Sequence, residues 1–199
     1  MSALFKLSYG LFVLTAKKGD KDTGCIINTA MQVTDSPTQI SICVNNSNYT
    51  CELIKETKEY NISILSQNAS FDLFKRFGFQ SGRNVDKFEG FDAVERAENG
   101  INYITEGVNG VLSVKVTKMI DLGTHTMFIG DLVGEKVLDD TPSATYQYYF
   151  DHIKPAPENQ EKKKGFVCTI CGYVYEGDEL PPDFICPICK HGAEVFKPL

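Results

Sequence analysis

Four cysteines in the last part of the chain are the residues most able to do chemistry. They form two Cys-x-x-Cys pairs, Cys168 with Cys171 and Cys186 with Cys189. Each pair can direct two thiolates toward one point, so the two pairs together predict a tetrahedral four-sulfur metal site. The spacing fits both zinc, which would make the site structural, and iron, which would make it an electron carrier. The region that holds these cysteines is too short to bury enough apolar surface to fold alone. A bound metal must therefore contribute folding free energy.

The residues around these cysteines favour iron. Four aromatic residues are expected to form a core beside the cage, namely Tyr173, Tyr175, Phe184 and Phe196. Together with Cys-Gly-Tyr after the first pair and Leu-Pro-Pro-Asp-Phe-Ile-Cys-Pro at the second, this pattern resembles rubredoxin. That family holds one iron through four thiolates and cycles it between the Fe3+ and Fe2+ forms. Zinc ribbons share the cage but rarely the aromatic pattern.

The resemblance has departures that leave all four ligands in place. Fourteen residues separate the two pairs, a short spacing found in rubredoxin domains fused to other redox proteins, and Phe184 stands where tryptophan is common. Lys190 follows the last cysteine, where glycine is usual. If that turn needs a positive φ, lysine costs about 1 kcal/mol there. Gly172 permits a tight turn whose N–H groups can point at sulfur and tune the potential.

Composition excludes several classes of function. The formal net charge is −6, and basic residues are scattered apart from Lys162 to Lys164, which argues against a nucleic-acid partner. We find no apolar run long enough to span a bilayer and no secretory signal, so we expect a cytoplasmic protein. The remaining cysteines, Cys25, Cys43 and Cys51, are odd in number and widely separated. They are a poor disulfide framework and are expected to be buried small residues in a reducing compartment.

A change in composition predicts two domains. The stretch 154–164 has no large apolar residue and is typical of a linker. It separates a domain at 1–153 from a small one at 165–199. The small domain has five acidic and two basic residues between Phe166 and Leu199. This excess of negative charge fits either solubility or steering toward a complementary partner.

The first domain is expected to be mainly β. Strands are predicted at 11–16, 25–32, 39–44, 60–65, 111–120 and 125–137. Two helices are expected between them, one after Asn48 as N-cap and one at 71–77 with Gly78 as C-cap. Many strands and few helices suggest a small barrel. We find neither a Gly-x-Gly-x-x-Gly fingerprint nor a phosphate-binding P-loop.

Four segments of this domain resemble the flavin reductase family. They are Thr23 to Thr34 with Pro37, Val44 to Thr50 with Leu53 and Ile54, Phe77 to Phe88, and Gly123 to Val133. They occur in family order over most of residues 1–150. The resemblance implies an FMN-binding split β-barrel that forms a homodimer, with FMN near the subunit interface.

The same resemblance implies the residues that bind FMN. A polar rim for the isoalloxazine ring is implied at Asn28, Thr29, Ala30 and Gln32. Donors for the phosphate are implied at Asn48, Tyr49 and Thr50, where N–H groups open a helix, and Asn45 is implied as a further FMN-binding residue. Ser81, Gly82, Arg83 and Lys87 complete the set, the two cations serving the phosphate or a second nucleotide. From the residues alone, Arg83 and Lys87 would be solvated surface charges.

His125 and a tyrosine cluster have alternative roles. The family places a histidine in this Gly-x-His-x-x-Phe-x-Gly setting near the nicotinamide, although the preceding residue, often acidic, is Thr124 here. Its role would be alignment, since hydride transfer to flavin does not require a general base. A structural role for a lone histidine is the alternative. The tyrosines Tyr146, Tyr148 and Tyr149 are expected to pack the dimer, with covering of the flavin as the other reading.

The order of the two domains resembles the high-molecular-weight rubredoxins of anaerobic bacteria. It implies hydride transfer from NADH or NADPH to FMN, then single electrons to iron, and then a partner such as a flavodiiron protein that reduces oxygen or nitric oxide. One alternative is a flavin reductase that supplies reduced FMN to a separate oxygenase, with the metal module only for docking. Another is a flavin-binding sensor with a zinc ribbon. The sequence does not select NADH over NADPH.

Overall fold

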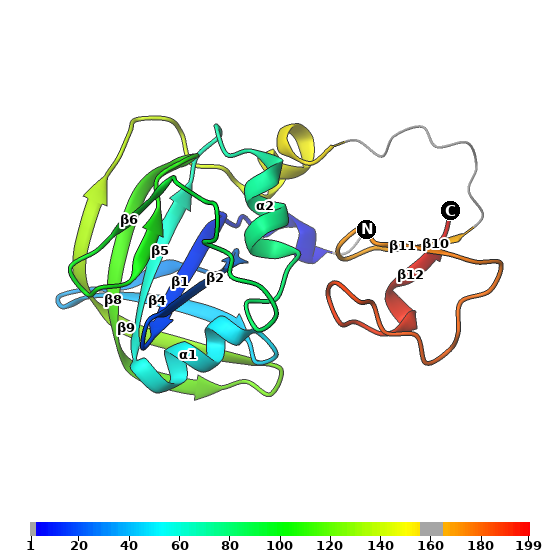
Figure 1. Cartoon of the computed structure of the whole chain (residues 1–199), viewed down its shortest axis with the longest axis horizontal. Helices are drawn as coiled ribbons and strands as arrows, with labels where there is room; N and C mark the ends of the chain where they lie inside the picture. The colour runs from blue at the N-terminus through cyan, green and yellow to red at the C-terminus, as the bar shows by residue number, and fades with distance from the viewer. Residues whose placement is uncertain (1–2, 156–164) are drawn as a thin grey trace. The chain divides into compact units, whose positions relative to one another are not determined.

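The computed structural model describes residues 3–155 and 165–199. It divides into two compact units, Met1–Lys154 and Pro155–Leu199 (Figure 1). The linker expected at 154–164 lies outside the described residues from residue 156 onward. In the described part of the chain, we find no helix with the length and apolar character needed to cross a membrane.

The first unit is built on one seven-stranded sheet in which all neighbouring strands are antiparallel. In spatial order the strands are β2 (Lys21–Ile27), β1 (Phe12–Lys18), β5 (Glu59–Leu65), β8 (Val108–Asp121), β9 (His125–Val137), β4 (Thr38–Asn45) and β3 (Met31–Asp35). Figure 1 shows β8 and β9 as a long ribbon that runs past the other strands. The mainly β architecture confirms the expected fold class.

The sheet must curl because its two edge strands are consecutive in the chain. β2 and β3 lie at opposite edges, yet only residues 28–30 separate them. Four Cα steps reach at most about 15 Å, so the two edges have to approach each other. Thr29 marks this seam: its hydroxyl donates to the Cys43 carbonyl of β4 at 2.8 Å and accepts from the Cys43 N–H at 3.2 Å. The result is a split barrel.

Two helices join two different hydrophobic cores. α1 (Tyr49–Thr57) adds Leu53 and Ile54 to a core that contains Leu14, whereas α2 (Phe71–Gly78) adds Phe77 to a core that contains Val13. Neighbouring residues of β1 therefore face different cores, as the two-residue period of a strand requires. This explains why the middle of β1 is buried on both faces.

Smaller elements complete the first unit. They are the short 3₁₀ turn η1 (Ala3–Lys6), the hairpin β6 (Val94–Arg96) with β7 (Asn102–Ile104), and α3 (Tyr146–Tyr148) with the following turn η2 (Tyr149–Ile153). Tyr149 is buried against Phe74, with ring centroids 4.4 Å apart. Tyr149 therefore packs inside its own unit, which is neither of the two roles expected for it.

Three sequence expectations need correction. The strand predicted at 25–32 is broken at 28–30, because those residues cross from one edge of the barrel to the other. Gly78 is the last residue of α2 rather than its cap, and Phe79 follows it with an ordinary negative φ of −105°. Cys25 and Cys51 are buried as expected, but Cys43 is only half-buried on β4.

The second unit is a three-stranded antiparallel sheet beside a small aromatic core. Its strands lie in the order β11 (Val174–Glu176), β10 (Gly165–Cys168) and β12 (Phe196–Pro198), and a 3₁₀ turn, η3 (Ala193–Val195), precedes β12. Phe184 packs edge-on against Tyr175 at 4.7 Å and against Phe196 at 5.3 Å, and stacks on Tyr173 at 6.3 Å. The predicted aromatic core is confirmed.

Candidate functional site

The four cysteines of the second unit converge on one point. Their sulfur atoms all lie within 4.8 Å of one another, with Cys168 to Cys189 and Cys171 to Cys186 each at 3.5 Å. A tetrahedral metal with bonds of about 2.3 Å to sulfur requires edges of about 3.8 Å, so the cage has the size of a metal tetrathiolate. Cys168 and Cys186 are buried, and the other two are half-buried.

Two matching turns build the cage. In the first, the Gly172 N–H donates to the Cys168 carbonyl at 2.8 Å; in the second, the Lys190 N–H donates to the Cys186 carbonyl at 2.9 Å. A second backbone bond closes each turn. The Cys168 N–H donates to the Tyr173 carbonyl, and the Cys186 N–H donates to the His191 carbonyl, both at 2.8 Å.

Backbone N–H groups of these turns point at the sulfurs. Tyr173 donates to the Cys171 sulfur and His191 to the Cys189 sulfur. Such bonds stabilise thiolates and shift the potential of a bound iron. The donor set therefore fits a four-thiolate metal ion, and the aromatic core beside it fits the iron form expected from the sequence.

On the first unit, the predicted flavin-ring residues gather at the barrel seam. Asn28, Thr29 and Ala30 form the loop between the two edges, and all three are half-buried. Thr29 is hydrogen-bonded to Cys43, which lies two residues before Asn45 at the end of β4. Gln32 lies on exposed β3, where its side-chain amide donates to the Thr34 carbonyl at 3.1 Å.

The predicted phosphate residues lie at the junction of β2, the start of α1 and the loop at 81–83. Thr23 has a buried hydroxyl with no hydrogen-bond partner in the described part of the chain. Gly82 is buried against it: a Cβ at Gly82 would lie 2.0 Å from that hydroxyl and 3.4 Å from the Tyr49 ring. Asn48 stands at the N-cap of α1 with its side chain making no capping bond.

This junction has the chemistry of an anion site. The N-terminus of α1 presents backbone N–H groups and the positive end of the helix dipole. Lys21 and Arg83 each lie 5.1 Å from the centroid of the Tyr49 ring. The orphaned hydroxyl, the close approach of the Gly82 backbone and these cations together fit the phosphate of FMN.

The two predicted cations of the 81–87 loop have different settings. Arg83 pairs with Glu52 on the first turn of α1, one bond being 2.8 Å, and holds the pKa of Glu52 below its usual value. The Ser81 hydroxyl, at the start of this loop, accepts a hydrogen bond from the Arg83 N–H at 3.3 Å.

Lys87 is almost fully buried, so the reading as a solvated surface charge is wrong for this residue. Its ammonium donates to the carbonyls of Gly24 at 2.8 Å and Phe77 at 2.9 Å. Burial lowers the pKa of Lys87 to about 8, and the described residues pair it with no carboxylate. Thr50 on α1 and Lys87 both interact with buried Cys25, whose pKa burial raises to about 11.

His125 begins β9 directly across from Asn45 of β4. It is half-buried, and its Nδ1 lies 2.9 Å from the Thr124 hydroxyl. Asn46 organises this corner: its side-chain oxygen accepts from Thr126 at 2.6 Å and from Lys55 at 3.0 Å, while its amide donates to the Gly123 carbonyl at 2.7 Å. The strand pairing thus brings the predicted nicotinamide-side histidine to the same end of β4 as the seam loop.

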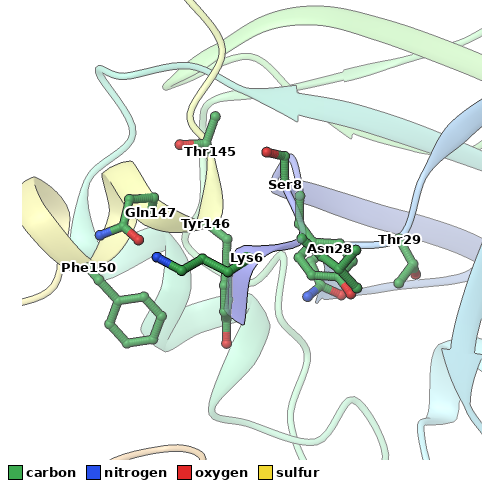
Figure 2. A pocket seen from close by; sticks show the side chains of 10 residues that line it. Lys6, Ser8, Asn28, Thr29, Thr145, Tyr146, Gln147 and Phe150 are labelled. Carbon is green, nitrogen blue, oxygen red and sulfur yellow. The ribbon is translucent and has the colours of Figure 1, made fainter. Parts of the chain in front are cut away.

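A cavity of about 630 Å³ opens beside the seam loop (Figure 2). Asn28 and Thr29 form one side of it, and residues from both ends of the first unit form the rest. Figure 2 shows Tyr146 in its middle, with Phe150 and the long side chain of Lys6 next to it.

Sequence reasoning missed several residues of these sites. Thr23 and Asn46 lie inside quoted family segments, but an orphaned hydroxyl and a bonding hub become visible only in three dimensions. Lys6 and Tyr9 line the cavity together with Phe150, which is far from them in sequence. Of the other lining residues, Asn28, Thr29 and Tyr146 are the ones that the sequence singles out.

Two family models match the chain in the order of its two units. The flavin reductase like domain matches residues 4–157, and the rubrerythrin, rubredoxin-like domain matches residues 166–197. The chain therefore belongs to the flavin reductase family and carries a rubredoxin-like domain after the barrel. Its family makes it an oxidoreductase.

One relative matches almost the whole chain, and others match about three quarters of it or less. The chain is 35% identical to the high molecular weight rubredoxin of Moorella thermoacetica, over 98% of this chain and 97% of the relative. It is 34% identical to the ferric-chelate reductase (NAD(P)H) of Archaeoglobus fulgidus, over 75% of this chain and 88% of that one. The barrel fold is shared with the NADH:FAD oxidoreductase SgcE6 of Streptomyces globisporus C-1027, with a TM-score of 0.60 and 21% identity, covering 70% and 81% of the two chains.

Proposed function

We propose that the chain is an NAD(P)H-dependent flavin and rubredoxin oxidoreductase that delivers single electrons to a redox partner. The observation that carries the proposal is the convergence of four thiolates, in a rubredoxin-like unit, on the same chain as a flavin reductase barrel. The relative named a ferric-chelate reductase (NAD(P)H) supports a nicotinamide as the electron source.

The barrel residues would hold FMN by its two ends. The seam loop at 28–30 with Asn45 would contact the ring, while the junction at Thr23, Asn48 and Gly82 would accept the phosphate. When bound, FMN supplies an acceptor for hydride, which carries two electrons, and reduced flavin can release these electrons one at a time. This suits the iron site, which accepts one electron at a time. Arg83 would hold the 81–83 loop against α1 by pairing with Glu52, and so would keep Gly82 at the phosphate site.

His125 would help to align the donor ring. Its place opposite Asn45, next to the seam, supports an orienting role, because hydride transfer depends on the approach of the two rings rather than on proton removal. Thr124 holds the histidine Nδ1 and so orients the imidazole.

A flavodiiron protein is the proposed terminal acceptor. The acidic excess of the second unit supports a partner with a basic docking surface. A homodimer through the barrel is part of the same proposal, since the family resemblance places FMN near a subunit interface.

The proposal is tested by purifying the protein without oxygen and determining its flavin, iron and zinc. We expect one FMN and one iron per chain, and flavin absorption that NADH or NADPH bleaches. Zinc in place of iron would favour a docking module on a flavin reductase, and flavin that neither donor reduces would favour a sensor. Either of these results would remove the proposed electron relay.

A further inference from the structure

We propose that the buried ammonium of Lys87 is a counter-charge for the FMN phosphate, which it attracts from the interior of the first unit without contacting it. Binding of FMN then draws a proton onto Lys87, and the site prefers the phosphorylated flavin to riboflavin. The inference rests on the proposed function, because it takes the junction at Thr23, Asn48 and Gly82 as the phosphate site.

Lys87 is a buried cation without a counter-ion. It is 3% exposed, and its ammonium donates to the carbonyls of Gly24 on β2 and Phe77 on α2. An ammonium has three N–H groups, so one of them is left without an acceptor in the described part of the chain. A buried charge without a counter-ion is destabilising, and an anion placed nearby offsets this cost.

Two short links connect Lys87 to the predicted phosphate residues. The first runs along β2, where Gly24 accepts from Lys87 and the preceding Thr23 carries the buried hydroxyl without a partner. The second passes through buried Cys25, which interacts both with the charge of Lys87 and with the side chain of Asn48. The ammonium is therefore separated from the junction by only a few contacts.

The charge of Lys87 can act over this separation because protein rather than water fills the space between. Two charges interact more strongly inside a protein than in water, and salt screens buried charges less. A phosphate monoester carries close to two negative charges above pH 7, since its second pKa is about 6. FMN therefore supplies the negative charge that the surroundings of Lys87 lack, whereas riboflavin has no phosphate to supply it.

The uptake of a proton follows from the state of Lys87 before FMN binds. Burial lowers the pKa of Lys87 to about 8, so near this pH about half of the flavin-free molecules hold a neutral lysine. A nearby dianion favours the charged form of the lysine. FMN binding therefore draws a proton onto it, and FMN affinity falls as the pH rises through this range.

The other titratable and charged groups around Lys87 come from every neighbouring segment. They are Cys25 of β2, Cys51 of α1 next to Cys25, Arg76 of α2, and Asp86 in the segment of Lys87 itself. Burial raises the pKa of both thiols, that of Cys25 to about 11, and so keeps them largely neutral up to pH 9. Lys87 is thus the group of this set whose charge changes most between pH 7 and 9.

The test measures the affinity of the flavin-free, full-length protein for FMN and for riboflavin between pH 7 and 9, by titration of flavin fluorescence. In wild type we expect Kd for FMN to rise about tenfold over this range and Kd for riboflavin to stay the same. Lys87→Met should weaken FMN binding at pH 7 by about tenfold or more, leave riboflavin binding unchanged, and remove the dependence on pH. Lys87→Arg keeps a charge that does not titrate in this range and should bind FMN tightly at both ends of it.

A matched control and a second measurement sharpen the test. Lys75→Met removes an equal charge from an exposed side chain of α2 that pairs with Asp72, and should keep the wild-type dependence on pH. The second measurement needs no variant. Wild type mixed with FMN at pH 8 in weakly buffered solution should take up about half a proton per FMN, detected with a pH indicator, and riboflavin should cause no uptake.

Three outcomes would overturn the proposal. An FMN affinity that follows the same pH profile as riboflavin affinity in wild type would show that Lys87 does not sense the phosphate. An equal loss of affinity for both flavins in Lys87→Met would assign the lysine a structural role. The same loss of pH dependence in Lys75→Met would assign the effect to total charge. Tight FMN binding by wild type at pH 7 would leave the proposed function standing in each case.

Discussion

Lys190 is the residue at which the two turns of the metal cage differ most. The matching position in the first turn is Gly172, with φ 79°, and Lys190 adopts φ 62° in the same left-handed region. Glycine adopts this conformation freely, but a side chain is strained there by about 1 kcal/mol. The turn therefore does require a positive φ at residue 190, and the cost expected for a lysine there applies.

Lys190→Gly is expected to stabilise the second unit by about 1 kcal/mol, because it removes the left-handed strain and leaves the backbone bond to Cys186 intact. In guanidinium, this variant should therefore release its metal more slowly than wild type. The loss of thiolate-to-metal absorption measures that release. Lys190→Gln removes the charge but keeps the strain, and should release the metal at the wild-type rate. A glutamine variant as stable as the glycine one would assign the effect to charge.

Lys87 leads to a prediction about pH. Its pKa of about 8 lies below its ordinary value of 10.5, so between these values the unfolded chain binds more protons than the folded one. The free energy of unfolding should therefore rise with pH through this window, by up to about 1.4 kcal/mol per pH unit. Above pH 9 the raised pKa of Cys25 acts in the opposite direction, so the interval from pH 8 to 9 isolates Lys87.

Urea unfolding of the barrel, followed by far-ultraviolet circular dichroism, measures this dependence. Lys87→Met should flatten the rise between pH 8 and 9. Arg76 donates to the backbone carbonyl of Lys87 at 3.1 Å, a bond that the methionine variant can keep. An equal slope in wild type and variant would mean that Lys87 is not the group responsible.

At the scale of elements, the seam loop shows what sequence patterns can and cannot provide. The strands at 39–44, 60–65 and 125–137 were predictable because alternating apolar residues report a half-buried face. The break at 28–30 was not, since nothing local in Cys25 to Gln32 interrupts the strand pattern. Closure of the barrel, which depends on contacts between distant segments, decides it.

The loop at 81–83 approaches β2 closely at the proposed phosphate site. Gly82→Ala would place a Cβ 2.0 Å from the Thr23 hydroxyl. The loop would have to move, and overpacking of this kind costs about 1–3 kcal/mol. We expect FMN affinity, measured by fluorescence titration of the flavin-free protein, to fall by about tenfold or more.

Gly134→Ala is a matched control on β9. A Cβ there would meet Ser113 at an ordinary 3.5 Å, and the backbone needs no positive φ. This variant should bind FMN as wild type does. Equal FMN affinities for Gly82→Ala and wild type would exclude the junction at Thr23, Asn48 and Gly82 as the phosphate site.

At the scale of the whole molecule, the two units were predictable to different depths. The metal ligands could be named from spacing alone, because four cysteines in two close pairs leave few alternatives. The barrel site depended on a family resemblance, and its buried parts were inaccessible to sequence: Lys87 looked like a surface charge, and the cavity joins Lys6 to Phe150 across most of the first unit.

A variant that lacks residues 165–199 should separate the two activities. The first unit has its own cores, so it should retain its fold and its reduction of flavin by NADH at about the wild-type rate. Transfer to a flavodiiron protein, assayed by oxygen uptake, should be lost. Undiminished uptake with the shortened chain would mean that electrons leave directly from the flavin.

The central claim is that electrons from a nicotinamide reach the four-cysteine iron of the same protein, and an anaerobic NADH titration tests it most directly. A flavin that takes two electrons and an iron that takes one require about 1.5 equivalents of NADH per chain for full reduction. We predict that both the flavin bands and the ferric-thiolate absorption are bleached at this end point. Bleaching of the flavin at about one equivalent, with the ferric absorption unchanged, would contradict the account.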